Sequence, residues 1–258
     1  MKLFDAHLHV VDPAFPLVPN AGYTPPAFTA TDYLRASAPL GVVGGAVVSG
    51  SFQAFDQTYL LAALHRLGPS FVGVTQLPPS APDQTVRELD TAGVRAVRFN
   101  LRRGGSAGLS DMAELAARVY DLAGWHAEVY VGGADLAGLE QVLASLPLVV
   151  VAHLGLRASG RSSLLRLVER GAKVKATGFG RLDFDPAPFV RDIVSADATA
   201  LLFGTDLPST RAPRPFDASD LRLLLDTLDP DAARLATYTN AISLYRPRDV
   251  LALNHGSG

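Results

Sequence analysis

Short apolar runs alternate with longer amphipathic segments along most of this chain. The short runs are bounded by turn-forming residues, which is typical of buried strands. The longer segments repeat apolar residues every three to four positions, as one face of a helix does. The pattern predicts strands at residues 2–9, 44–49, 71–76, 94–100, 126–131, 148–153, 172–177 and 200–204. It predicts helices at residues 55–66, 82–92, 111–123, 136–145, 162–170, 186–195, 218–228 and 231–245.

Eight strand-helix units within 258 residues predict an α/β fold of one kind, a (β/α)8 TIM barrel. A doubly wound sheet is the alternative for alternating strands and helices. It is disfavoured because no Gly-x-Gly-x-x-Gly follows any predicted strand. No stretch has the composition of a linker, so we expect a single domain over residues 1–258.

The alternation of side chains along the predicted strands sorts polar residues by face. In a barrel, the outward face packs on helices and is apolar, whereas the inward face near the mouth carries the chemistry. In strand 94–100, Val97 and Phe99 mark the outward face. The inward polar residues of three strands are then Arg98 and Asn100, His126, Glu128 and Tyr130, and Lys173 and Lys175.

Two histidines end the first predicted strand. The period of two places Asp5, His7 and His9 on one face, so the two imidazoles converge on one point. Neutral imidazole is the commonest metal ligand in proteins, and it also serves as an acid, a base or a donor to a carbonyl. A bare His-x-His pair is weak evidence for a functional site, so its interpretation depends on the rest of the chain.

Two more strands end in residues that can carry chemistry. His153 closes an apolar run, and Asp206 follows strand 200–204. In barrels, residues at the carboxyl ends of the strands form the active site. A hydrogen-bonded core histidine and a helix-capping aspartate are the structural alternatives. Opposite three imidazoles, however, Asp206 can act as a general base toward water or complete a metal site.

The other histidines receive no catalytic role. His126 stands at the start of its strand, so we expect a hydrogen-bonded structural residue. His65 falls on a predicted helix, and His255 falls in the C-terminal tail.

Composition narrows the classes of function. The net charge is −2 with no basic or acidic block, which disfavours nucleic acid or a membrane surface as a partner. The absence of cysteine excludes disulfides and thiolate chemistry, so a metal needs His, Asp, Glu or modified Lys as ligands. No signal peptide or membrane span is recognisable, and we expect a cytoplasmic protein. The sequence does not determine an oligomeric state.

Three motifs together resemble one known family. The opening Asp5-x-His7-x-His9, the segment 152–155 around His153 and the segment 204–208 around Asp206 are similar to the amidohydrolase superfamily. The similarity lies in its branch of TIM-barrel lactonases and related hydrolases (amidohydrolase family 2), and it runs to about residue 247. Within that branch the chain most resembles lactonases of the 2-pyrone-4,6-dicarboxylate type, through segments 97–100, 124–130 and 175–181.

The resemblance implies a lactonase that opens a small carboxylated lactone. Asp206 would deprotonate water, while His7, His9 and His153 polarise the carbonyl. The same four residues would bind one divalent metal, zinc or manganese, if the enzyme uses one; the pyrone type works without it. The implied substrate contacts are Arg98, Arg181, one of Arg102 and Arg103, and Asn100, Tyr130 and Lys175.

Two departures from the superfamily pattern limit the metal chemistry. Binuclear members carry a carboxylated lysine on the fourth strand, and mononuclear members commonly have a histidine ending the fifth. In this chain Asn100 or Arg98 stands at the place of the fourth-strand lysine. Tyr130 stands at the place of the fifth-strand histidine. A metal-dependent aldonolactonase, a decarboxylase of the same superfamily and a non-catalytic binding barrel remain as alternatives. We expect the loops 12–29 and 209–216 to rim the site and set its specificity.

Overall fold

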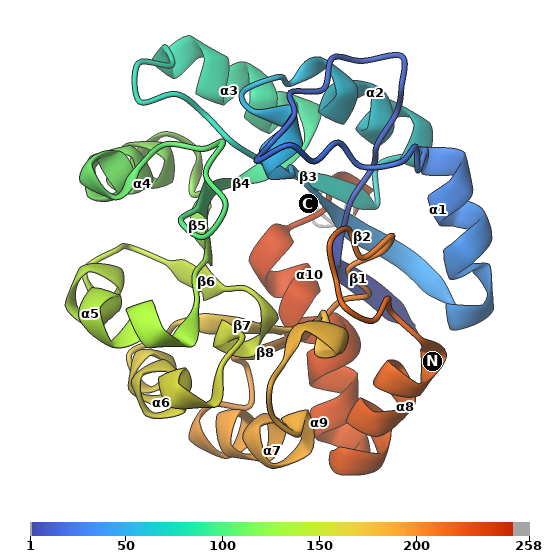
Figure 1. Cartoon of the computed structure of the whole chain (residues 1–258), viewed down its shortest axis with the longest axis vertical. Helices are drawn as coiled ribbons and strands as arrows, with labels where there is room; N and C mark the ends of the chain where they lie inside the picture. The colour runs from blue at the N-terminus through green and yellow to red at the C-terminus, as the bar shows by residue number, and fades with distance from the viewer. Residues whose placement is uncertain (1, 250–258) are drawn as a thin grey trace, which may run out of the picture.

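Eight parallel strands form the centre of the structure, a computed structural model that describes residues 2–249 (Figure 1). Each strand pairs with the next in sequence order. The strands are β1 (Leu3–Leu8), β2 (Val42–Val48), β3 (Phe71–Thr75), β4 (Val94–Asn100), β5 (His126–Tyr130), β6 (Val149–Val151), β7 (Lys173–Ala176) and β8 (Leu201–Phe203). The barrel closes where the segment after β8 meets β1, because the Asp206 amide donates to the His7 carbonyl at 2.7 Å. The predicted TIM barrel is confirmed.

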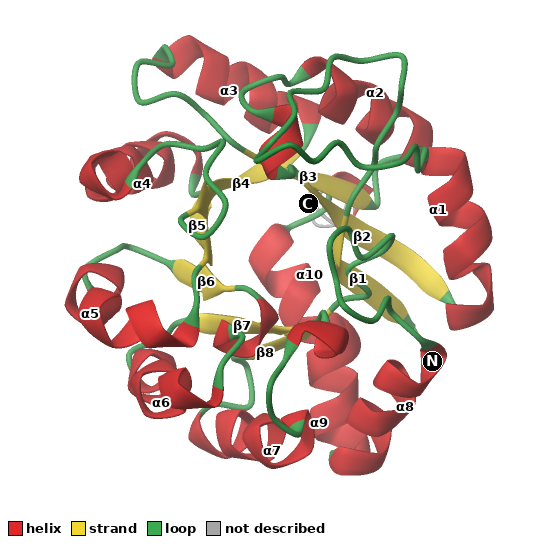
Figure 2. Cartoon of the chain, viewed as in Figure 1, coloured by secondary structure: helices red, strands yellow, loops and turns green. Residues whose placement is uncertain are grey.

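Helices surround the strands on the outside, apart from the last one, which lies across the barrel (Figure 2). They are α1 (Ala30–Ser37), α2 (Thr58–Leu67), α3 (Asp83–Ala92), α4 (Leu109–Ala123), α5 (Gly133–Ala144), α6 (Arg161–Glu169), α7 (Pro186–Ala196), α8 (Ala218–Thr227), α9 (Pro230–Arg234) and α10 (Asn240–Tyr245). A π-helical turn at Leu235–Thr239 joins α9 to α10, so the predicted helix 231–245 is nearly continuous. Within residues 2–249, no helix is both long and apolar enough to cross a membrane.

Helix α1 was not predicted from the sequence. Its first turn carries a capping box, in which the Thr29 hydroxyl accepts from the Asp32 amide and the Asp32 carboxylate accepts from the Thr29 amide. The spacing Thr-x-x-Asp is a sequence-level signal for a helix start, and it could have located this helix.

Two apolar layers form the core. The outer layer packs outward-facing strand residues such as Val97, Phe99 and Val129 against the helices. The inner layer fills the barrel with residues that include Val74 and Val150, together with Tyr245 of α10. Figure 1 shows α10 lying across the barrel, and its position in the inner layer closes the end opposite the strand carboxyl termini. Chemistry is therefore confined to the other end.

The predicted common face of Asp5, His7 and His9 is wrong for Asp5. Asp5 is paired with Gly45 of β2, yet Leu8 is paired with Val47, so β1 carries one extra residue between them. Such a bulge displaces the later side chains from the alternation set by the earlier ones.

Asp5 consequently points away from the two histidines, toward the seam between β1 and β8. Its carboxylate accepts from the amide and hydroxyl of Thr205, at 2.8 and 2.6 Å, and from the hydroxyl of Tyr33 on α1 at 2.9 Å. Asp5 therefore stabilises the closure of the barrel.

Candidate active site

A cavity opens at the carboxyl ends of the strands. Its lining includes eight of the eleven residues that the sequence named for the site: His9, Arg98, Asn100, Arg103, Tyr130, His153, Arg181 and Asp206. The three that do not line it are His7, Arg102 and Lys175. Gly50, Ser51, Phe52, Thr210 and Arg211 complete the lining.

Two histidines of β1 and the segment after it face Asp206. The Nε2 atoms of His7 and His9 lie 3.8 and 3.6 Å from Asp206 Oδ1. All three side chains are buried, and neither His7 Nε2 nor Asp206 Oδ1 has a hydrogen-bond partner among the described residues. Two unpartnered polar atoms at this depth indicate that the site receives a ligand, either a water molecule or part of a substrate.

Asp206 carries a full negative charge at neutral pH. Burial alone raises the pKa of a carboxyl group, but the Arg181 guanidinium and His153 more than offset it, so the pKa of Asp206 lies well below its ordinary value. Arg181 Nε donates to Asp206 Oδ2 at 2.7 Å. The backbone of Asp206 has a φ of 62°, and its hydrogen bond to the His7 carbonyl holds this unfavourable conformation. One oxygen is thus fixed by arginine and the other faces the histidines.

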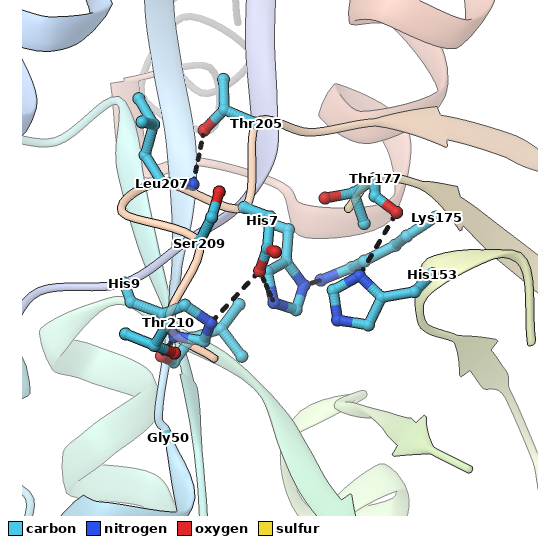
Figure 3. A network of polar contacts seen from close by, with 12 residues as sticks. His7, His9, Gly50, His153, Lys175, Thr177, Thr205, Leu207, Ser209 and Thr210 are labelled. Atoms are coloured by element: carbon cyan, nitrogen blue, oxygen red, sulfur yellow. Dashed lines mark hydrogen bonds and ion pairs between the residues drawn. The ribbon is translucent and has the colours of Figure 1, made fainter. Parts of the chain in front are cut away.

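The three imidazoles are oriented by different partners (Figure 3). His9 Nδ1 lies 2.7 Å from the Val48 carbonyl oxygen, and His153 Nδ1 lies 3.3 Å from the Thr177 carbonyl oxygen. His7 Nδ1 instead lies 3.4 Å from the Nζ of Lys175. Burial lowers the pKa of each imidazole, that of His153 to about 3, so all three are neutral near pH 7.

His7, His9 and Asp206 form a cluster whose ligand atoms lie within 4.8 Å of one another. The ligand types and spacing suit a small divalent cation, since tetrahedral zinc ligands stand about 3.4 Å apart. A metal-bound histidine, however, gives its other ring proton to an acceptor. His7 has an ammonium group at that position, so the donor set does not fit a cation that uses all three residues.

Arg98 is a buried cation without a carboxylate partner in the described structure. Its side chain is 4% exposed, its Nη1 donates to the Ser49 carbonyl at 2.7 Å, and its guanidinium lies 5.7 Å from the Tyr130 ring centre. A buried guanidinium that lines a cavity and lacks an anion is suited to a carboxylate of a ligand.

The two neighbouring arginines in the loop between β4 and α4 differ in their relation to the cavity. Arg103 lines the cavity, whereas Arg102 does not. Arg211, which sequence reasoning did not select, also lines it and lies 4.3 Å from the ring centre of Tyr23. Arg211 lies five residues after Asp206, in a loop at the carboxyl end of β8. This position could have identified it as a candidate site residue from the sequence.

The two predicted rim loops meet at this cavity. Arg211 donates to the side-chain oxygen of Asn20 at 3.1 Å and also to its backbone carbonyl. Asn20 Nδ2 donates in turn to the Arg103 carbonyl at 3.0 Å. Loop 12–29 is therefore tied to two of the loops that supply arginines to the mouth, those of Arg103 and Arg211.

Lys175, which the sequence predicted as a substrate contact, does not line the cavity. Its side chain is fully buried, and its Nζ donates to Glu128 Oε2 at 2.6 Å. Although it faces inward as expected, it lies one layer below the cavity, behind His7. His126 accordingly has the structural role that was expected, with Nε2 3.3 Å from Glu128 Oε1. Position along the strand, rather than face, separates these residues from the cavity.

Comparisons with known proteins agree with this geometry. The amidohydrolase family profile (Amidohydro_2) matches residues 4–246. A 2-pyrone-4,6-dicarboxylate hydrolase from Comamonas testosteroni is 33% identical over 156 residues, which cover 58% of this chain and 51% of that protein. The match thus spans about half the length of that relative. A 4-sulfomuconolactone hydrolase from Rhizobium radiobacter is 27% identical over 253 residues, 89% of this chain and 84% of that protein.

Solved structures share the fold. A probable 2-pyrone-4,6-dicarboxylic acid hydrolase from Acinetobacter baumannii, crystallised with citric acid bound, superposes with a TM-score of 0.80. It is 20% identical, and the match covers 95% of this chain and 100% of that chain.

Proposed function

The chain belongs to the amidohydrolase family that matches residues 4–246, and from this premise we propose that it hydrolyses a small carboxylated lactone. The observation that carries the proposal is the buried Asp206, whose free Oδ1 faces two histidines in a cavity lined by arginines. Two relatives are named as hydrolases of 2-pyrone-4,6-dicarboxylate and 4-sulfomuconolactone, both cyclic esters with acidic substituents.

The charge of the cavity supports an anionic substrate. Three of the lining arginines, Arg98, Arg103 and Arg211, form no ion pair with a carboxylate in the described structure, and Asp206 is neutralised by Arg181. An excess of cationic groups in a small cavity favours a ligand with more than one negative charge. Guanidinium groups bind carboxylates through paired hydrogen bonds, which also orient the ring.

The electrostatics of Asp206 limit the lactones it can open. Because its pKa lies below the ordinary value, Asp206 is ionised at neutral pH but is a weak proton acceptor. Such a base suffices when the carbonyl is activated and the leaving oxygen is stabilised, as in an enol ester. An unactivated sugar lactone needs a stronger base or a Lewis acid.

The reaction then proceeds with a simple proton balance. Water attacks the lactone carbonyl carbon while Asp206 Oδ1 accepts one of its protons, and the carbonyl π electrons move onto the carbonyl oxygen. The carbonyl bond then re-forms, the ring C–O bond breaks, and the departing oxygen takes the proton from Asp206. One water is consumed, and an open-chain acid is released.

We further propose that no resident metal takes part. The support is the donor set: the ammonium of Lys175 stands where a metal-bound His7 requires an acceptor. Removing metal from the purified protein with a chelator should therefore leave turnover of 2-pyrone-4,6-dicarboxylate, followed by its ultraviolet absorbance, within about twofold of the untreated rate.

Parallel assays separate the alternatives. Turnover that requires added zinc or manganese would retain the lactonase and reject the metal-independent route. A neutral aldonolactone should not be opened. No turnover of 2-pyrone-4,6-dicarboxylate or 4-sulfomuconolactone, with or without metal, would contradict the proposed function itself.

A further inference from the structure

A buried charged network lies directly beneath the active site. Glu128 on β5 accepts from Lys175 Nζ at 2.6 Å and from the hydroxyl of Tyr245 on α10 at 2.5 Å. His126 Nε2 lies 3.3 Å from Glu128 Oε1, the oxygen that also accepts from Tyr245. Glu128 is 2% exposed and Lys175 is 0% exposed, so water does not screen this pair.

Stability does not explain this network. Removing two charges from water costs several kcal/mol per ion, and apolar residues of similar volume are usually at least as stabilising. Apolar side chains fill the same layer of the barrel interior, where Phe4, Val48 and Val150 cluster with Tyr245. A charged pair retained among such neighbours indicates a role in the site above it.

The contact between Lys175 and His7 fixes where His7 carries its proton. An ammonium group has donors and no acceptor, so His7 Nδ1, 3.4 Å from Lys175 Nζ, must accept (Figure 3). Burial and the charge of Lys175 keep the pKa of His7 well below its ordinary value, so the ring is neutral. Its one N–H is then on Nε2, the atom directed at Asp206 Oδ1.

His9 and His153 have the opposite arrangement. Their Nδ1 atoms face the carbonyl oxygens of Val48 and Thr177, which can only accept. Each ring therefore carries its proton on Nδ1 and presents a bare Nε2 lone pair. Of the three imidazoles at the site, His7 alone offers an N–H donor.

We propose that Lys175, held by Glu128 and Tyr245, is a positioning residue that fixes His7 as the hydrogen-bond donor to the oxyanion formed during lactone hydrolysis. The catalytic part of this inference, the hydrogen bond from His7 to the oxyanion, rests on the proposed function. His7 is directly behind the cavity wall: its Nε2 lies 3.8 Å from Asp206 Oδ1 and its ring centre 4.9 Å from that of His153, and both of these residues line the cavity. The bare nitrogens of His9 and His153 serve a different purpose: one of them accepts the second O–H of the attacking water while Asp206 accepts the first.

The test reads the tautomer directly. In protein labelled with ¹⁵N-histidine, the ring nitrogens of a neutral imidazole have distinct chemical shifts according to which one is protonated. The signals of His7 are assigned by their loss in a His7→Gln variant. We expect wild-type His7 to be protonated at Nε2, and His9 and His153 at Nδ1. Protonation of wild-type His7 at Nδ1 would overturn the proposal without any variant.

A paired substitution tests the cause. The double variant Glu128→Gln with Lys175→Met removes both charges together and so leaves neither one buried alone. We expect His7 to move toward the Nδ1-protonated form and kcat to fall about 10²-fold, the effect of losing one oxyanion donor, with KM within about threefold. The control Lys173→Met, two residues earlier on β7 and paired with Asp197, should change neither quantity.

The outcomes distinguish the two proposals. An unchanged His7 tautomer in the folded double variant would reject the role of Lys175. A changed tautomer with unaltered kcat would reject the oxyanion role of His7. If the wild-type protein opens no lactone, the proposed function fails, and the spectra still decide whether Lys175 sets the tautomer.

Discussion

The two oxygens of Asp206 have different partners, and this asymmetry determines how the residue acts. Oδ2 is held by Arg181, while Oδ1 faces His7 and His9 without a hydrogen bond in the described structure. Arg181 keeps the carboxylate ionised and fixes its orientation, but it also weakens the carboxylate as a base. A carboxylate fixed in this way suits a substrate whose own leaving group is good.

Asp206→Asn should abolish turnover. The amide keeps the size and most hydrogen bonds of the carboxylate but accepts no proton, so we expect kcat to fall at least about 10³-fold. The circular dichroism spectrum should be unchanged. Asp226→Asn, at an exposed position on α8, is the matched control and should retain full activity. Near-full activity of Asp206→Asn would remove Asp206 as the base.

Arg102 and Arg103 offer a paired test of the anion site. Arg103 lines the cavity and Arg102 does not. Loss of a charge-assisted hydrogen bond to a carboxylate costs about 1.5–3 kcal/mol, so Arg103→Met should raise KM roughly 10- to 100-fold. Arg102→Met should leave KM unchanged in the same steady-state assay. Equal increases in KM for the two substitutions would show that Arg103 contributes only to the overall positive potential and does not bind the carboxylate directly.

At the scale of elements, the strand–helix alternation was predictable because each unit repeats a local pattern. All eight strands and the eight predicted helices are present. The short α1 was missed, since its eight residues contain too few apolar positions for a periodic signal. The bulge in β1 was also missed, because an extra residue becomes visible only against the register of β2.

The capping box of α1 supports an element that reaches the barrel seam through Tyr33 and Asp5. Thr29→Ala removes the side-chain acceptor of the cap and should lower the free energy of unfolding by about 1 kcal/mol. Urea denaturation measures this difference. Thr91→Ala, within exposed α3 where the hydroxyl bonds only to its own helix, should lower it by less than half as much. The reverse order would contradict a capping role.

At the scale of the whole molecule, the site depends on contacts between distant parts of the chain. His7 and Asp206 are brought together by the closure of β1 against the segment after β8, with Asp5 bonded to Thr205 on the same seam. The neutral imidazoles of His7 and His9 are buried at this closure, and that of His153 packs against His7. Protonation of these imidazoles therefore destabilises the whole folded protein.

The protein should lose stability on mild acidification. Burial, with the guanidiniums of Arg181 and Arg98, lowers the pKa of His153 from 6.5 to about 3. Because the unfolded chain binds this proton more tightly than the folded one, stability falls as the pH drops from about 6.5 toward 3. For His153 this loss is about 2 kcal/mol at pH 5.

Urea unfolding at pH 7.5 and pH 5 measures the loss. His153→Gln should show a smaller drop between the two pH values than the wild-type protein. His65→Gln, at an exposed position on α2, should show the full drop. An equal drop in His153→Gln and wild type would contradict a neutral buried His153.

Local pattern was enough to predict the barrel, the strand ends that carry His9, His153 and Asp206, and the arginines near those ends. These features follow from local periodicity and from the rule that barrel chemistry gathers at the carboxyl ends. Tertiary structure alone decided which residues reach the cavity. Lys175 faces inward as predicted but lies below His7, and Asp5 is turned away by the bulge.

The tautomers of the three histidines also depended on the fold. His9 and His153 meet carbonyl oxygens of β2 and of the segment after β7, whereas His7 meets an ammonium group of β7. These partners are between 24 and 168 residues away in the chain. A sequence pattern specifies the imidazole, but the hydrogen-bond partner at its far nitrogen is set by register and depth in the barrel, and that partner decides whether the ring donates or accepts.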